Sequence, residues 1–75
     1  MTIPLSYRGI ADDLAERIRI GEYPPGSKLP SGRQLATLYS VHISTAQKAV
    51  MALQERGVVV GAPGRGVFVR DSTGE

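Results

Sequence analysis

Only three residues, Ser40-Val41-His42, separate two segments of this chain that carry helical patterns. In the first segment Ser31 and Gln34 have the spacing of a capping box, and the apolar residues after them suffice for about two helical turns. In the second, apolar residues recur at i, i+3, i+4 and i+7, which predicts a helix from about residue 43 to 56, stopped by Gly57. Its expected core face has four residues: Ala46, Ala49, Val50 and Leu53. Two helices joined by so short a turn, the second with a polar outer face, form a helix-turn-helix.

A further helix is expected before this pair. Ser6 is a good N-cap, and Leu5 is placed to pack on Ile10 as a hydrophobic staple. Gly21 is expected to end the helix in a left-handed conformation, and the prolines after it prevent its continuation. The expected apolar stripe has three residues at intervals of four: Ile10, Leu14 and Ile18.

Two short β runs follow the third helix, Val58–Val60 and Val67–Arg70, and the glycine-rich segment 61–66 joins them as a hairpin loop. Pro25-Gly26 suits the centre of a type II turn, and residues 27–29 form an extended link. The predicted fold is mainly α with a small β-hairpin. It is a winged helix-turn-helix of three helices and a two- to three-stranded antiparallel wing. We expect Phe68 and Leu53 to be core residues, and the three tyrosines to lie in the core or at its rim.

The 75 residues are expected to form a single domain, residues 1–75, ordered from about residue 5 to 70 and without an effector-binding domain. Apolar residues make up 41% of the chain and charged residues 21%, which is ordinary for a folded domain. With one histidine, no cysteine and no cluster of metal ligands, we expect no enzymatic activity, metal or cofactor. No signal peptide or membrane-length apolar run is present, so a cytoplasmic protein without a membrane partner is expected.

The net charge of +2 is unevenly distributed. Residues 8–27 hold three arginines and four acids, whereas residues 28–70 hold six lysines or arginines and one acid. Such a basic half attracts polyanions at long range. A solvated surface that happens to be basic would have the same composition, so charge alone does not decide between the two.

One set of residues carries a family resemblance: Pro25-Gly26, Leu29-Pro30-Ser31, Arg33, Leu35-Ala36, Val41, Ala49, Leu53, Gly57 and Gly64-Arg65-Gly66-Val67-Phe68-Val69. From about residue 5 to 69 the chain resembles the DNA-binding domain of GntR-type bacterial transcription regulators. The resemblance implies that the third helix enters the major groove and that the wing tip touches the minor groove. The chain departs from the family pattern at Gly32, where glutamate is usual, and at Ile43 and Gln47, where base-contacting arginines are usual.

Several residues around the expected turn are candidates for DNA contact. Arg33 lies in the first turn of a helix, where the dipole favours a phosphate; a solvated or ion-paired arginine is the alternative. His42, Ser44 and Thr45 lie at the end of the recognition helix that faces base edges. Their alternative role is capping, because Ser44 and Gln47 also have capping-box spacing.

Three further candidates complete the interface. Gln47 can pair bidentately with adenine, and Lys48 suits a phosphate. Arg65, between Gly64 and Gly66, lies at a hairpin tip that can approach a narrow minor groove; an exposed charge in an ordinary turn is the alternative. Ile43 is a weaker candidate, for a thymine methyl.

The sequence thus predicts a sequence-specific double-stranded DNA-binding transcription regulator that acts as a repressor. Two copies are expected to bind DNA as a homodimer, and no small-molecule effector site is visible in the chain. A protein-interaction module, with Ile43, Met51 and the wing valines as the contact surface, is the alternative. The basic segment 28–70 favours DNA over a protein partner.

Overall fold

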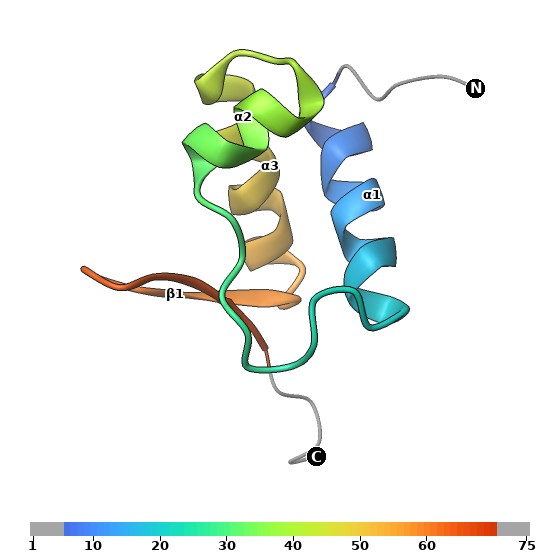
Figure 1. Ribbon diagram of the computed structural model, residues 1–75, viewed down its shortest axis with the longest axis vertical. Coiled ribbons are helices and arrows are strands. Elements are labelled where there is room, and N and C mark those ends of the chain that lie inside the picture. The colour runs from blue at the N-terminus through green and yellow to red at the C-terminus, as the bar shows by residue number, and fades with distance from the viewer. Residues whose placement is uncertain (1–5, 71–75) are drawn as a thin grey trace.

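The computed structural model describes residues 6–70, and Leu5 with its expected staple lies outside them. Within this range the chain forms three helices and one two-stranded antiparallel sheet. The elements are α1 (Tyr7–Arg19), α2 (Gly32–Tyr39), α3 (Ile43–Glu55), β1 (Val59–Ala62) and β2 (Gly66–Val69). The helices gather on one side, and the hairpin runs past them and projects outward as a wing (Figure 1). The predicted winged helix-turn-helix is therefore confirmed.

Each helix begins and ends at a residue whose chemistry accounts for the boundary. The Ser6 hydroxyl accepts a hydrogen bond from the Gly9 amide at 3.1 Å, as expected of an N-cap. Gly21 has a φ of +91°, which confirms the predicted left-handed end of α1. After α2, Ser40 adopts a φ of +56°, and this left-handed residue turns the chain sharply toward α3.

The segment between α1 and α2 forms the predicted turn and then joins the wing. Gly26 has a φ of +84°, and the Ser27 amide donates to the Pro24 carbonyl at 3.0 Å, which closes the turn. Beyond it, Lys28 forms an antiparallel bridge with Phe68, and the Leu29 amide donates to the Val67 carbonyl at 2.8 Å. The wing thus has two full strands and a third backbone segment along β2, within the predicted range of two to three.

The core lies where α3 packs against both α1 and α2. Every residue of the predicted core face of α3 is buried, as are Ile10 and Leu14 of α1. Tyr39 is buried, and Tyr7 and Tyr23 are partly buried and pack against the core. The prediction that the three tyrosines lie in the core or at its rim is therefore confirmed.

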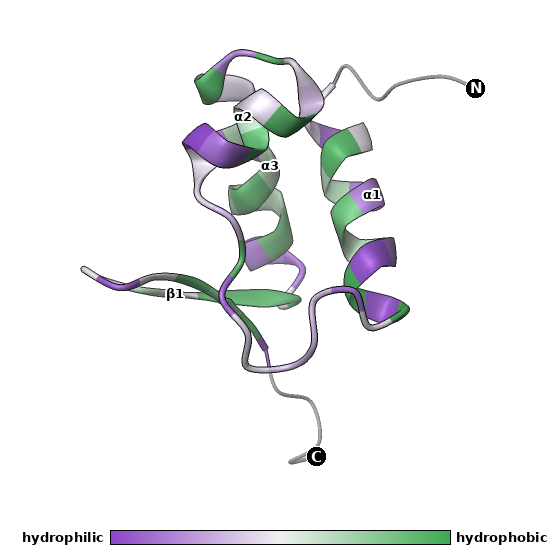
Figure 2. Ribbon diagram, in the orientation of Figure 1, coloured by the Kyte–Doolittle hydropathy of each residue, from purple (hydrophilic) through white to green (hydrophobic). Residues whose placement is uncertain are grey.

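The prediction that Phe68 is a core residue is wrong. Successive side chains of a strand point to opposite faces, and the paired Val59 and Val69 take the buried face of the hairpin. Phe68 pairs with Val60 on the other face, where Val60 is 49% exposed and Phe68 is half-buried. Figure 2 shows hydrophobic colour along the strands and a hydrophilic tip.

The hairpin loop is shorter than predicted. β1 extends through Gly61 and Ala62, Ala62 pairs with Gly66, and only residues 63–65 make the turn. The Arg65 amide donates to the Ala62 carbonyl at 2.9 Å, which closes this turn. Gly61 belongs to the strand because it pairs with Val67, and its missing side chain leaves room for Gln54: a Cβ there would lie 2.7 Å from Gln54 Nε2.

Candidate nucleic-acid interface

The start of α2 presents Arg33 to solvent in a capped first turn. The Gln34 amide donates to Ser31 Oγ at 3.1 Å, and the Ser31 amide donates to Gln34 Oε1 at 2.9 Å, which is the predicted capping box. Arg33 is exposed and makes no ion pair with any residue from 6 to 70. Its guanidinium is therefore available to an anion near the positive end of the helix dipole.

The start of α3 is capped by His42 and not by Ser44. His42 Nδ1 accepts a hydrogen bond from the Ser44 amide at 3.1 Å and lies 3.0 Å from Ser44 Oγ. The capping box suggested by the spacing of Ser44 and Gln47 is thus not formed, because Ser44 already lies inside the helix. Since Nδ1 accepts, the proton of a neutral ring is on Nε2, which is left as a donor. His42 and Ser44 are exposed, and Thr45 is half-buried.

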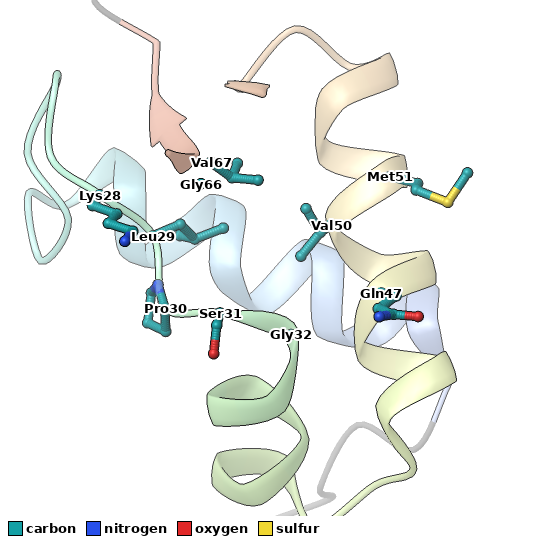
Figure 3. A pocket seen from close by; sticks show the side chains of 10 residues that line it. All are labelled: Lys28, Leu29, Pro30, Ser31, Gly32, Gln47, Val50, Met51, Gly66 and Val67. Atoms are coloured by element: carbon teal, nitrogen blue, oxygen red, sulfur yellow. The ribbon is translucent and has the colours of Figure 1, made fainter. Parts of the chain in front are cut away.

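A groove of about 390 Å³ joins α3 to the start of α2 and to the start of β2, next to the turn of the wing (Figure 3). Gln47, Val50 and Met51 line it from α3, residues 28–32 from the segment entering α2, and Gly66 and Val67 from β2. Two predicted site residues that are 19 positions apart in the sequence, Gln47 and Gly66, therefore border the same groove.

Two glycines allow side chains to lie close to the backbone at this groove. At Gly66 a Cβ would lie 2.7 Å from Lys28 Cε, so the Lys28 side chain runs against the backbone of the wing. At Gly32 a Cβ would lie 3.1 Å from Gln47 Cγ. At both glycines an exposed polar side chain, Lys28 or Gln47, therefore lies beside the groove.

Lys28 is the groove residue that sequence reasoning missed. It is exposed and makes no ion pair with residues 6–70. Its place in the basic segment was visible in the sequence, but its place beside the wing depends on the bridge to Phe68. Pairing across 40 residues has no local signal in one sequence.

Lys48 lies on the other flank of α3. A hollow of about 230 Å³ there is lined by Tyr7, Lys48, Met51, Ala52 and Glu55. Met51, which is 59% exposed, lines both hollows and so marks the ridge of α3 between them. The structure therefore places Gln47 and Lys48 on either side of one exposed helix ridge.

The tip of the wing projects away from the helices (Figure 1), and Arg65 belongs to its turn, residues 63–65. Gly64 and Gly66 have φ values of +76° and +120°, conformations that favour glycine. Arg65 is exposed between them and forms no ion pair with the described residues. The tip thus offers a cation on a narrow backbone turn.

Ion pairs with arginine neutralise the acidic side chains of residues 8–27, which form the acidic side of the molecule. Arg17 Nε lies 2.9 Å from Asp13 Oδ2, and Arg17 Nη1 lies 2.9 Å from Glu22 Oε2. Arg56 pairs with Asp12 at 2.8 Å, and Arg19 pairs with Glu16. All four acids of residues 8–27 are therefore paired with arginine. The cations without such partners in the described part of the chain include Lys28, Arg33, Lys48 and Arg65, so positive charge dominates around the groove and the wing tip.

The comparison with family models decides the class of this protein. Residues 6–69 match the model of the bacterial regulatory proteins of the gntR family. The chain belongs to the GntR family. The chain is also similar to Bacillus subtilis YdfD, an uncharacterized HTH-type transcriptional regulator, with 40% identity over 89% of this chain and 14% of that protein. The B. subtilis transcriptional repressor YtrA is 33% identical over 88% of this chain and 51% of its own length.

The fold is also similar to that of a solved DNA-binding domain. The AraR DNA-binding domain, solved in complex with operator ORR3, superposes with a TM-score of 0.78 and 25% identity, covering 92% of each chain. The present chain spans between 13% and 26% of the length of four curated relatives that it matches at 37% identity or better. These relatives are transcriptional regulators.

Residues 6–70 contain neither a membrane-spanning helix nor a cluster of metal-ligating side chains. No helix there combines the length and hydrophobicity that crossing a bilayer requires. No group of three or more His, Cys, Asp or Glu side chains in the same range is arranged to hold a metal ion.

Proposed function

We propose that this GntR-family chain binds double-stranded DNA in a sequence-specific manner and acts as a transcription repressor. The observation that carries the proposal is the groove where the exposed ridge of α3, the start of α2 and the start of β2 meet. Around it lie cations that make no ion pair within residues 6–70. In this arrangement α3 would enter the major groove and residues 63–65 would reach the minor groove.

The residues around the ridge divide into two roles. Arg33, Lys48 and Lys28 would contact phosphates, which give affinity and salt dependence without reading sequence. Gln47 would read an adenine edge, since its amide matches the donor and acceptor of that base. His42, Ser44 and Thr45 would contact base edges or phosphates from the start of α3.

The wing would add a minor-groove contact. Arg65 would insert where the groove is narrow and its potential most negative, and Gly64 and Gly66 would let the backbone approach.

Two similar proteins support DNA binding and repression, the two general parts of the proposal. AraR is described with operator DNA and YtrA as a repressor. A repressor of this type would act in the cytoplasm as a homodimer on two half-sites about 10 base pairs apart. Residues 1–75 would form its single DNA-binding domain.

Charge-removing variants test the proposed surface. We expect Arg33→Ala and Arg65→Ala each to weaken binding to a fluorescent duplex of mixed sequence and to flatten the slope of log K against log salt by about 0.9. The matched control is Arg19→Ala, which removes the same charge from an ion pair on α1. Anisotropy titrations between low and physiological salt measure both quantities.

Equal losses in all three variants would contradict the proposed surface, because they would reflect net charge alone. DNA binding that is insensitive to salt would contradict the proposal as a whole. Unchanged affinity of Arg33→Ala and Arg65→Ala would favour the protein-interaction alternative.

A further inference from the structure

Gly32 has no conformational reason to be glycine. It is the first residue of α2, and its φ lies outside the left-handed region, unlike five other glycines of the described chain. Alanine is at least as favourable in a helix with ordinary dihedral angles. The reason for glycine must therefore lie in what surrounds this residue.

The neighbour that uses the space is Gln47. Its Cγ lies 3.1 Å from the position of a Cβ at residue 32, and its Nε2 lies 3.9 Å from the same point. A contact of 3.1 Å is too close for an unstrained pair of carbons, which prefer about 3.5–4.0 Å. Because Cγ is near the base of the side chain, rotating the terminal amide alone cannot relieve the contact. A side chain at residue 32 would therefore shift Gln47 Cγ by a few tenths of an ångström and move the terminal amide with it.

We propose that Gly32 is a positioning residue for sequence recognition: the missing side chain allows Gln47 to hold the conformation in which its amide reads an adenine. This inference rests on the proposed DNA-binding function and extends it to a residue of α2. A bidentate pair is sensitive to small displacements, because both the nitrogen and the oxygen of the amide must meet their partners. Both residues line the same groove (Figure 3), so one substitution acts directly on the other.

A double-mutant cycle tests the coupling. A site selected from random DNA by the unaltered protein is first used to find the base pair whose preference is lost in Gln47→Ala. Discrimination against the other bases at that position is then measured for the unaltered protein, Gly32→Ala, Gln47→Ala and the double variant. We expect Gly32→Ala to reduce discrimination there several-fold, within the roughly 5- to 100-fold range of one bidentate contact. In the Gln47→Ala background it should have no further effect.

Two controls separate positioning from folding. Gly32→Ala should keep the circular dichroism spectrum and the urea midpoint, and Gly32→Ser provides a second, bulkier change at the same position. Thr37→Ala improves the helix propensity of α2 five residues further along and should leave base discrimination unchanged.

The outcomes separate this inference from the function on which it rests. An equal effect of Gly32→Ala in both backgrounds, or no effect of either Gly32 variant, would overturn the positioning role while DNA binding stands. A base preference that survives Gln47→Ala would overturn it too. Failure of the unaltered protein to select any sequence would instead overturn the proposed function itself.

Discussion

Tyr39 ties α2 to α1 through one short hydrogen bond. The Tyr39 side chain is buried, with 7% of the residue exposed, and its hydroxyl donates to Asp13 Oδ2 at 2.5 Å. Arg17 Nε donates to the same oxygen at 2.9 Å. The Tyr39 hydroxyl, followed by Arg17, lowers the pKa of Asp13, while burial and the nearby carboxylate raise the pKa of Tyr39. Asp13 is thus one anchor between helices and not only part of an acidic outer face.

This hydrogen bond predicts a pH dependence of stability. A carboxyl whose pKa is lowered by folding stabilises the fold above its ordinary pKa of 3.8, and that contribution is lost as the pH falls below this value. We expect Tyr39→Phe to lower the free energy of unfolding by about 1 kcal/mol at neutral pH and to reduce its fall at acid pH. Urea denaturation at pH 6 and pH 3 measures both effects. Parallel pH profiles for the two proteins would contradict this account of Asp13.

The sequence predicts the role of some helix-capping residues correctly and of others incorrectly. The capping box of Ser31 was predictable because all of its partners lie within four positions. Ser44 and Gln47 also have capping-box spacing. However, α3 begins at Ile43, soon after the left-handed residue Ser40, so the N-cap is His42, two residues before Ser44. Local spacing therefore identifies a possible cap, whereas the turn decides which candidate is used.

At the scale of elements, the helices follow from the sequence more closely than the wing. Apolar periodicity and end signals predicted α1 and α3, and α3 ends one residue before the expected limit. In the wing, cross-strand pairing extends β1 through Gly61 and Ala62. That pairing also puts Phe68 on the half-buried face. Glycines that signal a loop locally can belong to a strand when the partner strand pairs with them, as Val67 does with Gly61.

Ser31 at the start of α2 and Ser44 at the start of α3 provide a matched test of which residues cap these helices. We expect Ser31→Ala to cost about 1 kcal/mol in unfolding free energy, because it removes the acceptor for the Gln34 amide. Ser44→Ala should cost much less, because the cap of α3 is provided by His42. Urea denaturation followed by circular dichroism compares the two variants. Equal losses would contradict the assignment of the caps.

On the scale of the whole molecule, the core and the proposed DNA-binding surface lie on different faces of the helices. The inner faces of the three helices form the core, while the outer ridge of α3 and the wing tip carry polar and basic groups. The sequence predicted which residues carry the charge, but not that arginines 17, 19 and 56 are used in ion pairs on the acidic side. Which cations remain available depends on the packing of distant segments.

Two leucines test the position of the core. Leu53 is fully buried, whereas Leu38 is 58% exposed although it lies in a helix that packs on the core. We expect Leu53→Ala to lower the unfolding free energy by about 2–5 kcal/mol and Leu38→Ala to change it by no more than about 0.5 kcal/mol. Urea titrations provide the comparison. A larger loss for Leu38→Ala would contradict the described packing.

Selection from a random library of DNA duplexes at near-physiological salt decides whether this chain reads a DNA sequence. We expect enrichment of a two-fold symmetric site, with an A·T pair opposite Gln47 that changes to G·C in a parallel selection with Gln47→Arg. An unchanged base preference in that variant would contradict the reading role of Gln47. If the unaltered protein enriches no sequence, the claim that this chain is a sequence-specific DNA-binding domain is contradicted.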